Sequence, residues 1–477
     1  MKFSELPNVV SIPNDYWVDV IRPMLLRSEY APVNANDDIN DFVFYDNGDI
    51  ILPKYFWHTI YPKFFKKHFL DKSYIKQLKY IQPTSIESVK LKEGVKPRSY
   101  QNEVITPVFD MWEKTNHTRC VIQGTTGFGK TFVALYLIAH LKIKPIIIVH
   151  NETLFKQWQG AIDDFLDIDK DRIGIIQGSN VKKIKKELEK DIIIVKVQSL
   201  LSQVKRIPLT ELYELYKDIS IVFEDEVHIS GSAQKYGKVN AIFRTLNIIG
   251  LSATPDQKGT HKLLLETNIG TTVLKSSHRN LVPKVVLKIL SGCSEPSILK
   301  RMEYVREYVQ KLALYNNAMT SSSKFIHKII TDAIDHVKNE NRRILIIAAN
   351  NTMVAHITER LILAGINAKQ FTAKHKDIKD AQVIVSNNQM SSTGFSEDSL
   401  DTLYLCNGNV GKTLLIQTAG RIVRLYEGKK SPLMHLYFDE LYLKKLNNKL
   451  QYIVKNNIST EYKDGLEYIV EQEGENN

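Results

Sequence analysis

Residues 124–131 read Gly-Thr-Thr-Gly-Phe-Gly-Lys-Thr, and their types and spacing suit the binding of a nucleotide phosphate. They match G-x-x-x-x-G-K-[ST] between an apolar, strand-like run and a helical one, the context that this pattern requires. Glycines let the loop fold back so that backbone N–H groups point inward, where they bind phosphate together with the helix N-terminus. The alternative is a glycine-rich turn before an ordinary helix, which the match at every fixed position disfavours. The predicted phosphate-binding residues are Gly124, Thr125, Thr126, Gly127, Phe128, Gly129, Lys130 and Thr131.

Within this loop, Lys130 can reach the β- and γ-phosphates and the Thr131 hydroxyl can ligate Mg²⁺. A second group of candidate residues follows the apolar run 219–223, which reads as a buried strand and leads into Glu-Asp-Glu-Val-His. Acidic residues at the carboxyl end of a parallel strand lie in the crevice where such sheets bind ligands. Asp225 is placed to hold Mg²⁺ through its waters, and Glu226 to polarise an attacking water. Acidic strand ends are common by themselves, but one that follows a phosphate loop is strong evidence of a hydrolytic site.

These stretches, with Ser252-Ala253-Thr254 at the end of a further strand, resemble motifs I, II and III of superfamily 2 helicases. The resemblance implies that the nucleotide is ATP, that Mg²⁺ accompanies it, and that hydrolysis drives a motor on nucleic acid. It further implies an adenine-reading segment at Arg98 and Gln101, and a motif Ia between Asn151 and Trp158. The implied coupling residues are His228, Ser252 and Thr254. The implied nucleic-acid contacts are Asn151, Gln157, Trp158, Gln198, Ser199, Ser392, Thr393 and Gly394.

A third candidate group, Gln417-Thr-Ala-Gly-Arg421-Ile-Val-Arg424, matches the family's motif VI, Q-x-x-G-R-x-x-R. On a helix, Gln417, Arg421 and Arg424 are spaced to share one face. Two guanidiniums on one face suit the γ-phosphate of a nucleotide held by another lobe, which is the arginine-finger role. A surface helix with two unrelated arginines is the alternative, and it is disfavoured once motifs I to III are present.

Two departures from the family pattern are informative. The segment 408–413 imitates a phosphate loop, but Cys406 stands where the first glycine is required, so we interpret it as the loop before the motif VI helix. In motif V many superfamily 2 helicases end in Gly-x-Asp, whereas Gly394 is followed by Phe395 and Ser396. This Ser-Thr-Gly-x-Ser form resembles phage branch-migration helicases of the UvsW type.

The elements that must position these groups alternate between apolar strands and helices from about residue 96 onward, as in parallel sheets covered on both faces. The expected fold is α/β, with two tandem RecA-like parallel-sheet lobes and a small N-terminal accessory α+β domain. The expected domains are 1–95 (accessory, DNA-binding), 96–280 (first lobe, ATP-binding), 281–440 (second lobe) and 441–477 (helical tail). A helical segment from Arg301 to Asn317 is expected to brace the second lobe.

The region before residue 96 contains an expected hairpin around Asn47-Gly48, followed by interleaved aromatic and basic residues from Tyr55 to Phe69. Aromatic faces can stack on unpaired bases while lysines neutralise phosphate. A domain this small also needs an aromatic core, and we expect that role for most of these aromatics. The lysines Lys63, Lys66 and Lys67 are therefore the better candidates for contact with DNA.

Composition sets the wider limits. With 477 residues, 43% hydrophobic and 25% charged, the chain is long enough for two or three soluble globular domains. Its net charge of +11 suits a polyanionic partner without specifying one. Cys120, Cys293 and Cys406 are far apart and are expected to be reduced core residues. No apolar run approaches the ~18 residues of a membrane span, and no signal peptide is evident, so we expect a cytoplasmic protein, in the host cytoplasm if it is viral or phage-encoded.

The expected function is an ATP-dependent DNA helicase or translocase that unwinds or branch-migrates forked and junction DNA in phage or viral replication, recombination or repair. Its expected partners are forked, branched or single-stranded DNA, with RNA not excluded, and it is expected to act as a monomer away from membranes. Three alternatives stay open: a viral transcription or RNA helicase, a double-strand translocase, and a nucleotide-gated clamp. The clamp is disfavoured by Glu226 and the paired arginines, because a clamp has no need of fast hydrolysis.

Overall fold

The computed structural model describes residues 8–33, 38–46, 48–64, 70–74, 78–125, 127–227, 239–253, 255, 258–276, 281–293, 296–305, 308–387, 397–408, 412–424, 428–440 and 468–473. The chain divides into two compact units, residues 1–278 and 279–477. Each is built on a seven-stranded sheet in which every strand pair is parallel, so the predicted α/β fold with two RecA-like lobes is confirmed.

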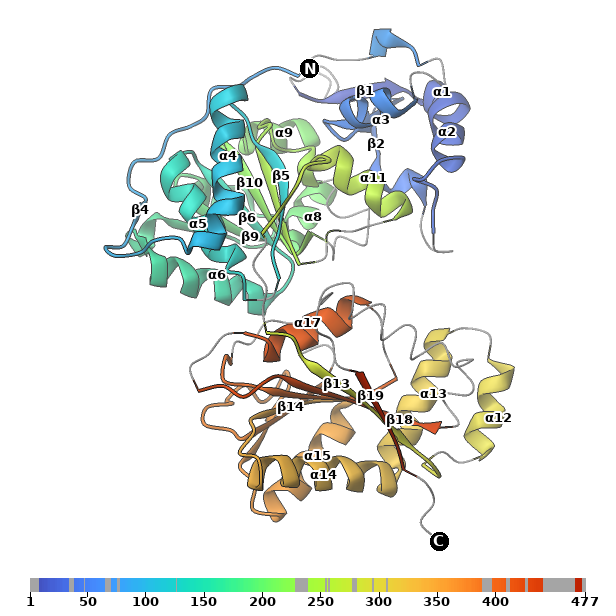
Figure 1. Cartoon of the computed structure of the whole chain (residues 1–477). Helices are drawn as coiled ribbons and strands as arrows, with labels where there is room; N and C mark the ends of the chain where they lie inside the picture. Colours follow the sequence, from blue (N-terminus) through green and yellow to red (C-terminus); the bar gives the residue numbers. More distant parts are fainter. Residues whose placement is uncertain are drawn as a thin grey trace. The chain divides into compact units, whose positions relative to one another are not determined.

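The sheet of the first unit has the strand order β12-β5-β11-β10-β6-β9-β8. Its central strands are continuous runs of branched apolar residues, buried along nearly their whole length, as expected when helices cover both faces. The strands are β5 (Arg119–Gln123), β6 (Pro145–Val149), β8 (Ile173–Ile176), β9 (Ile192–Lys196), β10 (Ile221–Asp225), β11 (Ile248–Ser252) and β12 (Val273–Lys275). The helices around it are α4 (Asn102–Thr115), α5 (Lys130–Leu141), α6 (Glu152–Phe165), α7 (Val181–Leu188), α8 (Val197–Arg206), α9 (Leu209–Leu215) and α11 (Gly259–Asn268) (Figure 1).

The N-terminal segment forms its own three-stranded antiparallel sheet of order β1-β3-β2, with β1 at Val10–Pro13, β2 at Phe44–Asp46 and β3 at Asp49–Leu52. The predicted hairpin is present: Asp46 pairs with Asp49, and Gly48 adopts the positive φ of 91° that a tight turn requires. Helix α3 (Phe56–Phe64) follows the hairpin and lies against α11 (Figure 1).

This small domain shares a hydrophobic core with the rest of the first unit. Buried side chains of the two parts form one cluster, in which Phe56 and Ile60 of α3 belong with Leu263 and Leu264 of α11. Polar contacts add to this core: the Tyr55 backbone N–H donates to the Thr267 carbonyl at 3.1 Å. The expectation that most aromatics of this region are core residues is confirmed for the described ones, because Tyr55, Phe56, Trp57 and Phe64 are buried.

Of the three candidate lysines, Lys63 has a different environment from the one we predicted. The Lys63 ammonium lies 2.8 Å from a Glu266 carboxylate oxygen and 3.2 Å from one of Glu29, and it also donates to the Tyr30 hydroxyl. Lys63 therefore ties the small domain to α11. Lys66 and Lys67 lie outside the described residues.

The sheet of the second unit has the order β15-β16-β14-β17-β18-β13-β19. Its strands are β13 (Lys284–Leu290), β14 (Ile344–Ala348), β15 (Ala368–Phe371), β16 (Val383–Asn387), β17 (Thr402–Cys406), β18 (Leu433–Asp439) and β19 (Tyr468–Glu473). Its helices are α12 (Pro296–Tyr304), α13 (Tyr308–Ser321), α14 (Ser323–Lys338), α15 (Asn351–Leu363) and α17 (Lys412–Ile422). The helix expected from Arg301 to Asn317 is thus two helices, α12 and α13, which lie side by side (Figure 1).

Cys120, Cys293 and Cys406 are buried free thiols, as predicted. Among the described residues, the structure contains no helix that is both long and apolar enough to cross a membrane. The tail from 441 to 477 is predicted to be helical, but its described part is a strand, β19, which pairs with β13. Residues 441–467 and 474–477 lie outside the described part of the chain.

Candidate nucleotide site and nucleic-acid contacts

The phosphate loop connects β5 to the N-terminus of α5, as its pattern predicts. Gly127 and Gly129 adopt φ values of 89° and 88°, a left-handed conformation that glycine tolerates best. The Lys130 ammonium donates a 2.9 Å hydrogen bond to the Gly124 carbonyl, which folds the side chain back over the loop. The Gly124 N–H donates to the Ser252 carbonyl at 3.1 Å, so the predicted motif III strand directly supports the loop.

Two glycines of the loop are required by close packing. A Cβ on Gly124 would lie 2.3 Å from the ring of Phe128, which is itself buried. A Cβ on Gly129 would lie 2.6 Å from Nε2 of Gln101. A larger residue at Gly124 would therefore displace the Phe128 ring, and one at Gly129 would displace the Gln101 amide and strain the backbone.

Gln101 braces this loop from the start of α4. Its Nε2 donates to the Phe128 carbonyl at 2.9 Å, and its Oε1 accepts from the Arg98 backbone N–H at 2.9 Å. The side chain is 4% exposed, whereas Arg98 is exposed and donates to the Tyr100 hydroxyl. The segment predicted to read adenine is thus physically joined to the phosphate loop, while its contact with the base stays a prediction.

Asp225 is the last residue of β10 and is almost completely buried. Burial raises the pKa of its carboxyl and the Glu226 charge raises it further, while the Lys130 charge lowers it. The phosphate-loop lysine therefore lies close enough to the acidic strand end for its charge to favour the Asp225 carboxylate, as a site for phosphate and a cation requires. Glu226 follows with a φ of 53°, a left-handed conformation that is uncommon for a residue with a Cβ.

Trp158 has a different environment from the predicted contact with nucleic acid. Its side chain is 0% exposed, and its indole Nε1 donates a 2.8 Å hydrogen bond to Oδ2 of Asp225. An indole N–H is a donor only, so this bond holds one carboxylate oxygen and leaves Oδ1 for another partner. The structure accordingly assigns Trp158 the support of Asp225.

Glu224, the residue before Asp225, is held inside the protein and supports the fold. Glu224 is buried, and its Oε1 accepts a 2.6 Å hydrogen bond from Nδ2 of Asn240. Burial raises its pKa to about 7, and the Asn240 bond lowers it in part. Asn240 belongs to the segment that leads to β11, so this bond connects the two strands that end at the site.

Other predicted nucleic-acid contacts gather at the carboxyl ends of β6 and β9. Asn151 caps α6 by accepting from the Leu154 N–H at 2.8 Å, and Gln198 donates to the His150 carbonyl at 2.6 Å. Gln157 is exposed, whereas Ser199 is buried and accepts from the Gly178 N–H at 3.2 Å. Asn151 and Gln157 belong to the start and the middle of α6, and Gln198 and Ser199 to the start of α8. These two helices follow β6 and β9, which are paired.

His150 is a site residue that the sequence analysis did not single out. Its positive charge, when present, lowers the pKa of Asp225, which places it near the acidic group. Its position in the sequence could have indicated this role, because His150 is the first polar residue after the buried strand β6, at the edge where parallel sheets bind ligands.

The residues of the first unit fit ATP with a divalent cation. The loop offers backbone donors at a helix N-terminus, an ammonium and the partly exposed Thr131 hydroxyl. Asp225 offers a carboxylate oxygen that the Trp158 bond does not use, and hard oxygen donors of this kind suit Mg²⁺. Asp225 and Thr131 would hold the cation, which would neutralise phosphate charge.

In the second unit, Gln417 and Arg421 lie on α17, but this helix ends at Ile422. Arg424 therefore does not share the predicted helix face. Its Nη1 lies 2.6 Å from Oδ1 of Asp398, and its carbonyl accepts from Lys429 at 2.9 Å. Arg421 is 9% exposed, so most of its stem is enclosed by the lobe.

Several predicted residues lie outside the described part of the chain, and their roles stay predictions. They are Thr126 of the phosphate loop, His228 and Thr254 of the coupling motifs, and Ser392, Thr393 and Gly394 of motif V.

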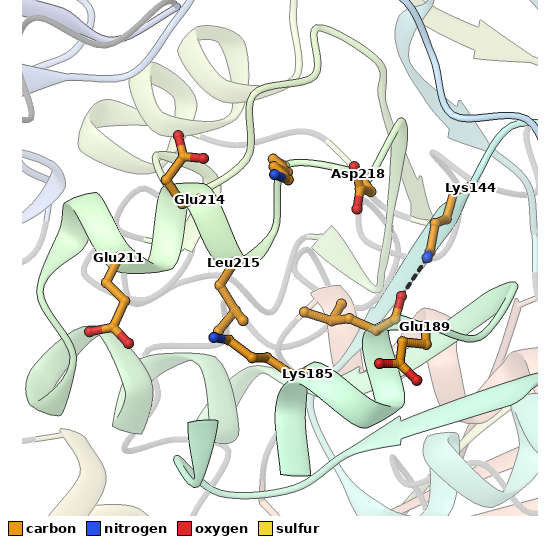
Figure 2. A pocket seen from close by; sticks show the side chains of 9 residues that line it. Lys144, Lys185, Glu189, Glu211, Glu214, Leu215 and Asp218 are labelled. Atoms are coloured by element: carbon orange, nitrogen blue, oxygen red, sulfur yellow. Dashed lines mark hydrogen bonds between the residues drawn. The ribbon is translucent and has the colours of Figure 1, made fainter. Parts of the chain in front are cut away.

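A hollow of about 470 Å³ at the opposite edge of the first sheet is not the nucleotide site. It lies beside Lys144 and Asp218, which precede β6 and β10, at their amino ends. Figure 2 shows side chains of both charge signs around it, with Glu189, Glu211 and Glu214 as well as Lys144 and Lys185. The Lys144 ammonium also donates to the Leu188 carbonyl, and this arrangement offers no cradle for phosphates.

Comparison with known proteins agrees with this geometry. The family described as "Type III restriction enzyme, res subunit" matches residues 94–257, which contain the phosphate loop and the acidic strand end. The chain is similar to transcript termination protein A18 of fowlpox virus (strain NVSL), with 25% identity over 65% of this chain and 67% of that protein. It is similar to probable helicase D10 of Escherichia phage T5, with 23% identity over 75% of this chain and 79% of that protein.

Two further likenesses cover smaller parts of the other protein. DNA 3'-5' translocase XPB2 of Sulfurisphaera tokodaii is 28% identical over 47% of this chain and 45% of its own length. Among solved structures, the ATP-dependent Type ISP restriction-modification enzyme LlaBIII bound to DNA aligns with a TM-score of 0.56 at 15% identity. The alignment covers 80% of this chain and 32% of that enzyme, so the chain spans about a third of it and the likeness is one of fold.

Proposed function

We propose that this superfamily 2 helicase, a nucleic-acid-dependent ATPase, translocates along one strand of DNA and remodels forked and branched DNA. One observation supports the motor function most directly: Asp225, at the carboxyl end of β10, accepts a hydrogen bond from Trp158 of α6. The N-terminus of this same helix carries Asn151, a predicted nucleic-acid contact. One helix thus joins the nucleotide site to the predicted path of the strand.

The residues divide the chemistry as follows. Lys130 binds the β- and γ-phosphates, Asp225 and Thr131 hold Mg²⁺, and Glu226 accepts a proton from the attacking water. The bound cation would offset the charge that develops on the phosphate oxygens. Arg421 and Arg424 of the second lobe act as arginine fingers on the γ-phosphate, with Gln417 beside them.

Hydrolysis is coupled to movement because both lobes hold the nucleic-acid backbone. Asn151, Gln157 and Gln198 contribute from the first lobe, and Ser392 to Gly394 from the second, while the buried Ser199 supports the Gly178 backbone. His228, Ser252 and Thr254 relay the state of the nucleotide, and the bond between Gly124 and Ser252 supports such a relay. Backbone contacts carry no sequence information, so binding is independent of sequence and weakens with salt.

The domain assignment follows from this division. The first lobe (96–280) binds ATP and the second (281–440) completes hydrolysis, with β19 of the 441–477 tail extending the sheet of the second lobe. The small domain (1–95) directs the motor to forks and junctions, as the resemblance to branch-migration helicases implies. The protein acts as a monomer on DNA, in the host cytoplasm if, like its poxvirus and phage relatives, it is virus-encoded.

The test is a comparison of substrates. ATPase activity is measured with and without single-stranded DNA, and ATP-dependent unwinding is measured on forked DNA, four-way junctions and RNA duplexes. We expect DNA to stimulate ATPase and forked or four-way DNA to be processed in preference to RNA. No stimulation by any nucleic acid would contradict the motor, and preference for RNA would contradict only the proposed substrate.

A second candidate is release of transcripts by translocation on duplex DNA. It is favoured by the similarity to transcript termination protein A18 over 65% of this chain and to the translocase XPB2. Displacement of a third strand from a DNA triplex, without strand separation, would distinguish this activity from unwinding.

A further inference from the structure

A groove between α12 and α13 of the second unit lies outside every motif described above. It consists of two hollows, of about 480 and 400 Å³, that share Arg301, Leu314 and Asn317 as lining residues. The first hollow adds Tyr304 and Gln310, and the second adds Ser321. We call these six residues the α12–α13 groove.

The groove lies at the edge of the sheet where parallel α/β folds bind ligands. Asn316, adjacent to Asn317 on α13, accepts through its Oδ1 from the Gly408 N–H at 3.1 Å, just after the carboxyl end of β17. Thr320 of the same helix accepts from Asn350, which caps α15 just after β14. Helix α13 therefore both contacts the segments that follow β14 and β17 and lines the groove, which places the groove near the carboxyl ends of these strands.

Its side chains suit an unpaired nucleobase. Tyr304 is 78% exposed at the end of α12, and Arg301 is exposed one turn earlier on the same face. Neither makes a hydrogen bond or ion pair with any residue that the structure describes. An exposed aromatic ring offers a stacking face, a guanidinium offers stacking and charge, and the Gln310 and Asn317 amides can donate to and accept from base edges.

The local charge favours a polyanion. The described part of the segment 296–324, which supplies α12 and α13, carries Lys300, Lys311 and Lys324 in addition to Arg301, against one acidic residue, Glu303. A hollow of about 480 Å³ has the size of a small-ligand site, and a base inside a duplex is stacked and cannot enter it.

We propose that the α12–α13 groove binds one or two unpaired bases of single-stranded nucleic acid, with Tyr304 as the stacking platform. This inference rests on the proposed function, because it assigns that motor a grip on single strands beyond the backbone contacts of its motifs. It predicts affinity for single strands that duplexes of the same length do not share.

The experiment uses the full chain and a fluorescein-labelled oligothymidylate, with anisotropy as the readout. Tyr304→Ala is expected to weaken binding roughly 5- to 150-fold, the range that loss of one base–aromatic stack produces. Tyr304→Phe keeps the ring and is expected to bind within about 2-fold of the unmodified chain. Leu363→Ala is the matched control, because it removes an apolar side chain that is 81% exposed on the same unit and is expected to change nothing.

Further readouts distinguish base stacking in the groove from a general loss of DNA binding. Affinity for a duplex of equal length should not change in Tyr304→Ala, and kcat at saturating single strand should not change while the half-saturating DNA concentration rises. Equal affinity of Tyr304→Ala and the unmodified chain would overturn the groove, as would an equal loss for duplex and single strand. If the unmodified chain shows no DNA-stimulated ATPase, the proposed function fails by itself, whereas normal stimulation with an unaltered Tyr304→Ala removes only the groove.

Discussion

The indole Nε1 of Trp158 donates a 2.8 Å hydrogen bond to Oδ2 of Asp225, and both side chains are buried. This bond joins α6 to the end of β10. A displacement of α6 by a bound nucleic-acid strand would therefore move or release the Asp225 carboxylate. Groups that orient a ligand of a metal typically contribute 10- to 100-fold to metal affinity or activity.

Trp158→Phe should therefore lower kcat by about 10-fold or more and raise the Mg²⁺ concentration needed for half-maximal rate. Phenylalanine fills most of the space but has no N–H to donate. Steady-state ATPase across a Mg²⁺ titration measures the effect, with fluorescent-nucleotide binding as a second readout. An unchanged Mg²⁺ dependence would show that Trp158 only fills the core.

Glu226→Gln should keep nucleotide binding and stall turnover, because an amide cannot accept the proton of the attacking water. Lys130→Ala is the contrasting variant, since it removes the charge that reaches the phosphates and should abolish hydrolysis. Nucleotide binding and ATPase are measured on both. Near-normal turnover by Glu226→Gln would exclude Glu226 as the base.

Arg421→Ala should lower kcat by roughly 10³-fold or more and alter ATP affinity much less, as expected of an arginine finger. Arg424→Ala should also lower kcat. Because Arg424 pairs with Asp398 at 2.6 Å, Asp398→Ala tests whether that pair positions the arginine. An unchanged kcat in both arginine variants would refute the two-lobe site.

Lys54 should make stability depend on pH in a defined direction. Its ammonium is buried against the Phe243 and Thr245 carbonyls, and burial lowers its pKa from 10.5 to about 7. Between these values the unfolded chain keeps a proton that the folded chain has lost, so the free energy of unfolding attributable to Lys54 rises with pH.

Thermal melting from neutral pH to about pH 10 should show this gain in the unmodified chain and its absence in Lys54→Met. Lys217→Met serves as the control, since Lys217 is exposed. If the melting temperatures of Lys54→Met and the unmodified chain changed with pH in the same way over this range, the lowered pKa of Lys54 would be contradicted.

Substitutions of Lys63, Lys66 and Lys67 distinguish contact with DNA from ion pairing inside the protein. Lys66→Ala with Lys67→Ala should weaken junction binding and flatten the slope of log K against log salt by about 0.9 for each lost phosphate contact. Lys63→Ala should leave that slope unchanged, because Lys63 pairs with Glu29 and Glu266. A slope change in Lys63→Ala alone would show that this pairing gives way to DNA.

Local sequence by itself determined the two parallel-sheet lobes, the phosphate loop and the acidic strand end. A strand followed by a glycine-rich loop and a helix has few ways to fold, and the carboxyl ends of parallel strands meet at one edge. Lys130 and Asp225 are therefore expected to belong to one site, and the effect of the Lys130 charge on the Asp225 carboxyl agrees. The hairpin at Gly48 was predictable for the same reason, because its turn chemistry is local.

Tertiary structure alone decided what surrounds each side chain. Trp158 and Lys63 were both predicted at a nucleic-acid surface, yet one lies inside against Asp225 and the other pairs with Glu266, over two hundred positions along the chain. Arg424 departs from its helix face because α17 ends at Ile422. Periodicity specifies which face of an element is apolar, but partners distant in sequence are chosen by packing of the whole unit, and no local pattern contains that information.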